Sequence, residues 1–133
     1  MQTNQTAKDL SSYRLETAEE CLSAAKLLLK GEKYRDATNR SYYCVFHCIR
    51  SILALENVDF KKHTAVISYF RENYIKTEKF EKRISDIVGD LFHLRGKSDY
   101  EDFFIISKQE VKEQVENAEY FLKQIKAYLA KRP

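Results

Sequence analysis

Residues 33–56 read KYRDATNRSYYCVFHCIRSILALE and contain neither glycine nor proline. Small and apolar side chains recur every three or four positions, at Ala37, Ser41, Val45, Cys48, Ile52 and Leu55. This spacing places them on one face of an α-helix. Further apolar side chains at positions 42, 46 and 49 widen the face, so we expect a helix that is buried over much of its circumference.

The same periodicity continues on the N-terminal side. Apolar residues at positions 15, 18, 22, 25 and 29 predict a helix that stops near Gly31. Residues 57–62 have the character of a connection. A shorter helix is predicted over residues 63–74, with Val66, Ile67 and Phe70 facing inward.

Two further helices are predicted in the C-terminal half. Thr77 is a candidate cap for a helix that carries apolar residues from 80 to 94 and weakens at residues 96–99. Ser107 followed by Glu110 is a capping-box pattern that introduces a last helix with apolar positions from 111 to 129. The predicted fold is therefore all-α, an antiparallel bundle of four long helices plus one short helix.

The composition agrees with a single helical domain. The chain has 133 residues, of which 44% are apolar and 32% charged, with 23 Lys and Arg against 20 Asp and Glu. This balance is typical of a folded domain, and the length suits one core. With only three glycines and one proline, the chain lacks the turn residues of an all-β fold. We expect one domain over residues 1–133, with its core at about 10–130.

The sequence gives no sign of a membrane or secretory protein. The longest apolar run is five residues, at 42–46, whereas a membrane span needs about 20. The first ten residues, MQTNQTAKDL, lack the apolar centre of a signal peptide. The cysteines Cys21, Cys44 and Cys48 are odd in number and lack CxxC spacing, so we expect reduced thiols in a cytoplasmic protein.

Charge is distributed unevenly along the chain. Residues 30–63 contain seven Lys and Arg against four Asp and Glu, whereas residues 99–119 contain seven acids against two lysines. The basic stretch permits a local phosphate-binding surface. It is much weaker than the charge of a protein that reads duplex DNA.

Polar residues crowd the helix that should be mainly core. Tyr43 and His47 are four positions apart and share a face, and Asn39 and Arg40 lie one turn earlier. One interpretation is a functional cluster. The other is structural, since a buried Tyr or His often only directs its polar atom to a partner.

A metal site is a further interpretation of the same helix. Cys44, His47 and Cys48 have the i, i+3, i+4 spacing of zinc ligands, and Cys21 or His93 would have to supply the fourth. Small cysteines are also common where helices pack closely. We expect no bound metal and no cofactor.

The second unusual stretch is 94–100, LRGKSDY. If the helix persists there, Arg95 and Asp99 are four apart and can pair. The structural interpretation is a helix end at which the dipole favours a cation. The functional interpretation is an Arg fork for a phosphate, beside the Tyr100 hydroxyl. No P-loop, GxGxxG, HExxH or GxSxG pattern is present.

Three stretches taken together resemble the HEPN domain (higher eukaryotes and prokaryotes nucleotide-binding). They are DATNRSYYCVFH at 36–47, KHTAVI at 62–67 and RGKSDY at 95–100. The likeness is to small stand-alone prokaryotic members with a Tyr-Tyr-x-x-Phe-His helix and an Arg-x-x-x-Asp-Tyr end. It implies a homodimer with a shared cleft, and a minimal nucleotidyltransferase as partner in a toxin–antitoxin or defence pair. Many such proteins are metal-independent endoribonucleases.

The chain departs from the ribonuclease signature of this family, in which a His follows the Arg after four to six residues. Tyr100, Glu101 and Asp102 stand there instead. Arg95 can stabilise a phosphorane, and the general base then falls to Asp99, Tyr100 or His47. His47 has the ordinary pKa suited to this role.

The resemblance assigns the remaining candidate residues to binding. Nucleotide or RNA binding is expected at Asn39, Arg40, Tyr43 and His63. The leading hypothesis is an RNA-cleaving toxin. The alternative is a non-catalytic nucleotide- or RNA-binding subunit of a nucleotidyltransferase.

Overall fold

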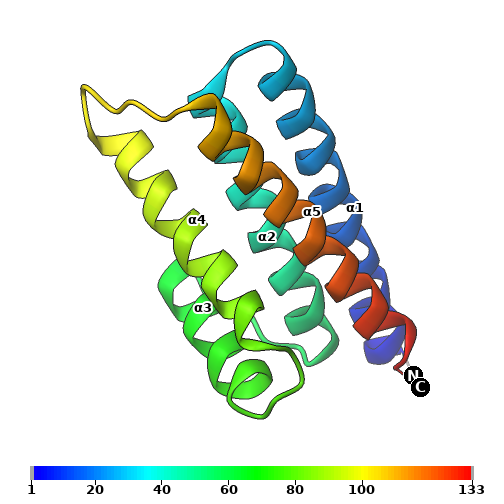
Figure 1. The fold of residues 1–133 in the computed structure, drawn as a ribbon. Helices are drawn as coiled ribbons and strands as arrows, with labels where there is room; N and C mark the ends of the chain where they lie inside the picture. The colour runs from blue at the N-terminus through cyan, green and yellow to red at the C-terminus, as the bar shows by residue number, and fades with distance from the viewer. Residues whose placement is uncertain (1, 133) are drawn as a thin grey trace.

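The computed structural model describes residues 2–132, with side chains from residue 5 onward. Five α-helices follow one another: α1 (Gln2–Lys30), α2 (Tyr34–Leu55), α3 (His63–Phe70), α4 (Lys82–Tyr100) and α5 (Lys108–Ala130). A single π-helical turn, η1 (Arg71–Ile75), continues α3. Residues 2–132 contain no β-strand. The predicted class, four long helices plus one short helix, is confirmed (Figure 1).

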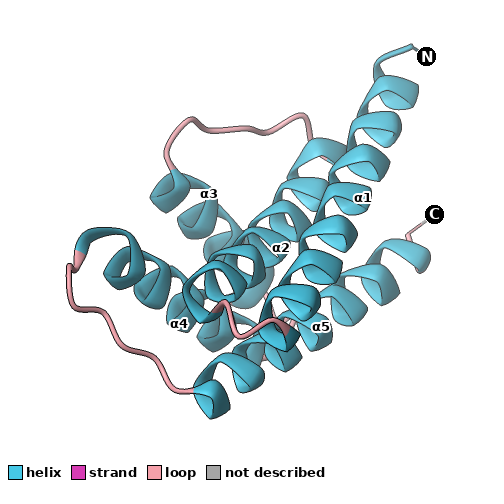
Figure 2. Ribbon diagram, turned by 90° about the horizontal axis from the view of Figure 1, so that it is seen from above, coloured by secondary structure: helices cyan, strands magenta, loops and turns pink. Residues whose placement is uncertain are grey.

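Helix α2 is the centre of the bundle. It packs against α1, α3, α4 and α5, and Figure 2 shows it surrounded by them. Its pairing with α1 is the most extensive, and Ala18, Ala25 and Ala37 are fully buried there. Small side chains let two helices approach closely, and large side chains such as Ile52 fill the core. Each large apolar side chain that is fully buried contributes about 1.5–3 kcal/mol to the free energy of unfolding. The expected burial of α2 over most of its circumference is confirmed.

The connection after α1 shows why that helix ends where it does. Glu32 adopts a left-handed backbone with φ of 61°, and the Lys33 N–H donates to the Leu28 carbonyl at 2.8 Å. This is the Schellman arrangement that closes a helix. The sequence indicated a stop near Gly31, and α1 does end at Lys30.

Two of the expected helix ends are wrong. Thr77 does not cap α4: its hydroxyl donates to the Asn73 carbonyl, and α4 begins at Lys82 after a turn with a left-handed Glu78. Nor does the helix weaken at residues 96–99, because α4 continues to Tyr100 with its Ser98 side chain buried.

The capping box before α5 is confirmed. The Ser107 hydroxyl accepts from the Glu110 N–H at 3.1 Å, and α5 begins at Lys108. Residues 101–107 cross from α4 to α5 as an extended connection. No helix within residues 2–132 is long and apolar enough to cross a bilayer.

Candidate functional site

The two unusual stretches of sequence meet where the end of α4 packs on α2. The Arg95 Cζ lies 5.2 Å from the centre of the Tyr42 ring and 5.4 Å from that of Tyr43. The two rings stand edge to face, with centres 5.1 Å apart. A guanidinium over aromatic rings gains cation–π attraction and is held in one place. With 24% of its side chain exposed, Arg95 still reaches solvent.

Asp99 lies one helical turn beyond Arg95 on the same face of α4. Its Oδ2 is 3.1 Å from the Arg95 Nε, so the expected ion pair forms. Although the contact lacks hydrogen-bond alignment, the carboxylate neutralises part of the charge and positions the guanidinium.

His63, the first residue of α3, joins this cluster from a third helix. Its Nδ1 is 2.7 Å from the Tyr42 hydroxyl, and its ring stacks on Phe46 with centres 4.0 Å apart. Burial and the nearby Arg95 lower the pKa of His63. Burial raises the pKa of Tyr42 well above its usual value, so its hydroxyl stays protonated. His63 is therefore fixed in orientation and neutral at pH 7.

His47 lies one turn beyond Tyr43 on α2, with ring centres 6.0 Å apart. Burial, followed by the charges of Arg50, Arg14 and Arg40, lowers the pKa of His47 to about 4. Its Nδ1 is buried and has no partner among the described residues. The expected ordinary pKa of His47 is thus wrong: a ring surrounded by guanidinium groups and poorly solvated disfavours the cation.

Asn39 and Arg40 extend the cluster along α2. The Arg40 Nη2 donates to the Asn39 Oδ1 at 2.8 Å, and the Arg40 Cζ lies 5.1 Å from the centre of the Tyr43 ring. Two arginines from different helices therefore contact one tyrosine. The structure brings together seven of the eight residues that the sequence singled out: Arg95, Asp99, His47, Asn39, Arg40, Tyr43 and His63.

The eighth residue, Tyr100, lies apart from this cluster. Its side chain is 85% exposed at the end of α4. Five positions separate it from Arg95, which corresponds to about 140° around a helix. Phe103 and Ile105, in the following connection, are likewise exposed.

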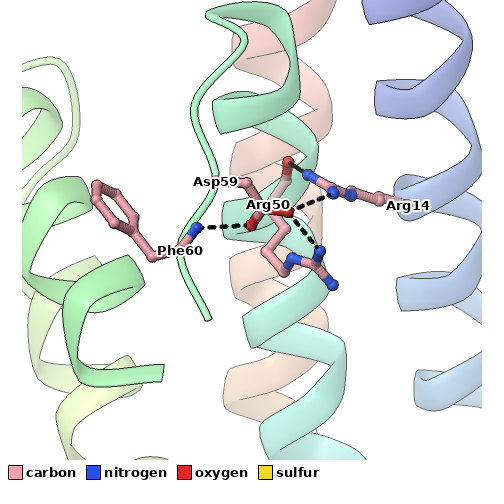
Figure 3. A network of polar contacts seen from close by, with 4 residues as sticks. All are labelled: Arg14, Arg50, Asp59 and Phe60. Atoms are coloured by element: carbon pink, nitrogen blue, oxygen red, sulfur yellow. Dashed lines mark hydrogen bonds and ion pairs between the residues drawn. The ribbon is translucent and has the colours of Figure 1, made fainter. Parts of the chain in front are cut away.

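Sequence reasoning missed an ionic network beside the cluster. Asp59 accepts from Arg14 at 3.1 Å and from Arg50 at 3.0 Å, and Arg14 also donates to the carbonyl of Arg50 (Figure 3). These contacts hold the Asp59 pKa below its usual value. Arg14 and Asp59 are far apart in the chain and on different elements, so no local spacing signals the pair.

The zinc interpretation finds no support in the geometry. Cys44 and Cys48 are fully buried, and the Cys44 thiol faces the Ala118 carbonyl. Among the described residues, no three His, Cys, Asp or Glu side chains are placed to hold a metal ion. The three cysteines are free thiols.

The pKa of His47 predicts how stability changes with pH. An unfolded histidine binds a proton below about pH 6.5, whereas folded His47 does so only near pH 4. The contribution of His47 to the free energy of unfolding therefore falls by up to about 3 kcal/mol as pH decreases from 6.5 to 4, and changes little above pH 6.5. His47→Gln should reduce this loss, measured by urea unfolding at pH 4.5 and 7.5. The exposed His93→Gln is the control; an equal effect there would contradict the assignment.

Together these features define a class of protein: an α-helical bundle with an arginine seated on paired tyrosines, next to two neutral histidines. The family model of the HEPN domain matches residues 11–128, and the chain belongs to this family. The resemblance drawn from the three sequence stretches is confirmed.

The relatives are small prokaryotic proteins. A Thermotoga maritima "UPF0332 protein" is 34% identical over 119 residues, which cover 90% of this chain and 89% of the relative. The Methanocaldococcus jannaschii "Putative toxin MJ0142" is 30% identical over 86% of this chain and 78% of its own length. "Putative toxin MJ0605" from the same organism is 40% identical over 65% of this chain and 64% of its own.

Proposed function

We propose that this protein is the HEPN toxin of a toxin–antitoxin or defence pair, which cleaves RNA in the cytoplasm without a metal ion. The proposal rests on one observation: the Arg95 guanidinium lies over the rings of Tyr42 and Tyr43, with His47 and His63 in the same cluster. The relatives named as putative toxins support the biological role.

The residues of the site have separate roles in the proposed reaction. Arg95, positioned by Asp99, binds the scissile phosphate and stabilises charge on the phosphorane. His47 is neutral at pH 7 and takes the proton of the attacking 2′-hydroxyl. The 2′-oxygen bonds to phosphorus, the bond to the 5′-oxygen breaks, and that oxygen takes a proton from water. A 2′,3′-cyclic phosphate and a 5′-hydroxyl result.

The other candidate residues bind the strand around this phosphate. Arg40 and His63 add donors, Tyr43 offers an aromatic surface, and Asn39 orients Arg40. Tyr100 is exposed at the end of α4, and we assign it a contact with the RNA strand or a second chain.

A second candidate function is a non-catalytic RNA- or nucleotide-binding subunit of a nucleotidyltransferase. One observation favours it: a histidine with a pKa of about 4 is a weak base, and Tyr42 occupies one nitrogen of the other histidine.

One experiment separates the two functions. Purified protein is incubated with RNA in the presence of EDTA, with and without a minimal nucleotidyltransferase, the partner that the toxin proposal expects. The toxin proposal expects cleavage in EDTA that the partner suppresses, and growth arrest on expression that the partner relieves. Binding without cleavage in every condition would support the second function instead.

We expect the protein to be a homodimer. A two-fold axis that brings both copies of Arg95 to one cleft would double the local positive charge available to a phosphate backbone. Light scattering at micromolar concentration should give about twice the chain mass of 15.7 kDa. A monomer at that concentration would contradict the shared cleft.

A further inference from the structure

A cavity of about 360 Å³ lies between α2 and the connection to α3, next to the arginine cluster. Its volume is at the lower end of small-molecule sites, which span roughly 300–1,000 Å³. The residues that line it come from a short part of the chain: Phe46, Arg50, Asp59, Phe60, Lys61 and His63. Only His63 belongs to the set of candidate residues already discussed.

The cavity is continuous with the phosphate site through His63. That ring lines the cavity, stacks on Phe46 and contacts the hydroxyl of Tyr42, on whose ring Arg95 lies. A ligand in the cavity therefore sits next to a phosphate held by Arg95. Two neighbouring nucleotides of one nucleic acid strand lie next to each other in the same way.

The aromatic side chains of the cavity offer a surface for stacking. Phe46 is buried behind His63, whereas Phe60 is 40% exposed and packs against Tyr69 with ring centres 5.6 Å apart. Figure 3 shows the Phe60 ring turned away from the ion pairs of Asp59. An aromatic ring that is partly exposed and has another ring packed behind it is suited to stacking with a nucleobase. Such stacking accepts any base and is common in proteins that bind single strands.

The charges of the cavity favour an anion. Two of the residues that line the cavity are cations, Arg50 and the exposed Lys61, against the single carboxylate of Asp59. That carboxylate is already paired with Arg50 and, outside the lining, with Arg14. The same ion pairs, with the Phe60 N–H donating to the Asp59 Oδ1 at 2.9 Å, fix the connection in place. A binding site built in advance loses little entropy when its ligand arrives.

We propose that this cavity is a subsite for one nucleotide of single-stranded RNA, adjacent to the phosphate bound by Arg95. The base stacks on Phe60, and Lys61 and Arg50 bind its phosphate. The inference rests on the proposed function, which it extends from the scissile phosphate to a neighbouring unit of the strand.

The test measures binding of a fluorescein-labelled, 2′-O-methylated oligoribonucleotide to the full chain by anisotropy. Phe60→Leu keeps apolar contact with Tyr69 but removes the planar face, and should weaken binding roughly 5- to 100-fold. Phe60→Tyr should bind within twofold of the original chain. Tyr13→Leu removes an exposed aromatic side chain from α1 and should change nothing.

Lys61 allows a second test of the subsite, based on electrostatics. Lys61→Ala should weaken binding and reduce the slope of log affinity against log salt concentration by about 1, as loss of one phosphate contact predicts. Lys76→Ala, at an exposed lysine paired with Glu72, is the matched control. Circular dichroism and melting confirm that each variant folds.

The outcomes separate the subsite from the proposed function. If Phe60→Leu binds as well as the original chain while Arg95→Ala stops cleavage, the subsite is wrong and the function stands. If Phe60→Leu weakens binding while Arg95→Ala cleaves normally, the subsite is supported and the catalytic assignment fails. If AMP displaces the RNA at equal concentration, and this displacement depends on Phe60, the cavity binds a free nucleotide. The assignment to a strand is then overturned.

Discussion

We expect Arg95→Ala to lower the rate of RNA cleavage by roughly 100- to 1,000-fold. Expression of this variant should then no longer arrest growth. The guanidinium offers two parallel donors to a phosphate. Its contacts with Tyr42 and Tyr43 are worth about 0.5–1 kcal/mol each, so the melting temperature should fall by only roughly 3–8 °C. Single-turnover cleavage and thermal melting of the same preparation measure both effects.

Two further variants sharpen this test. Arg95→Lys should restore activity only in part, because an ammonium group cannot reproduce the fork. Arg71→Ala, at an exposed arginine that hydrogen-bonds Ser85, should leave cleavage unchanged. If Arg95→Ala instead melts far lower and each folded molecule keeps its RNA affinity, Arg95 is a structural residue and the site assignment is wrong.

His47→Ala should lower the cleavage rate roughly 100- to 10,000-fold while RNA affinity stays within twofold. In the proposed mechanism His47 accepts the proton through its neutral imidazole, whereas Arg95 and its neighbours hold the phosphate. His93→Ala, at an exposed position of α4, is the control. Loss of RNA binding in His47→Ala would assign His47 to binding instead.

The pH–rate profile gives an independent check on His47. A base with a pKa of about 4 keeps its proton-accepting form down to that pH. Cleavage should therefore be nearly constant between pH 5 and 7, instead of declining below pH 6.5 as for an ordinary histidine. A decline centred at pH 6.5 would show that another group accepts the proton.

The helices were predictable because their apolar spacing is regular and the chain has few turn residues. The capping box at Ser107 even gave the start of α5 correctly. The start of α4 was not predictable in this way. Phe80 continues the apolar spacing but is buried in the turn before the helix, where the left-handed Glu78 redirects the chain. At the other end, tertiary burial of Ser98 and the pair of Arg95 with Asp99 extend a helix that Gly96 would weaken.

The candidate site was predictable in its residue types and less so in its electrostatics. Helical spacing placed Tyr43 and His47 on one face of α2, and the resemblance connected them to Arg95. The depressed pKa of His47 depends on Arg14 and Arg50, which reach it from two helices, and on burial by the assembled bundle. The Asp59 network also joins distant parts of the chain, so a sequence read alone provides no means of finding it.

The location of Arg95 on α4 has a consequence for the order of synthesis. Every residue that lines the cavity lies within positions 46–63, whereas Arg95 is made more than thirty residues later. The ribosome adds residues from the N-terminal side, and a domain generally folds as a unit. A nascent chain that ends before α4 thus contains the residues that line the cavity but lacks Arg95. We therefore expect a growing copy to be harmless to the RNA around it until α4 docks on α2.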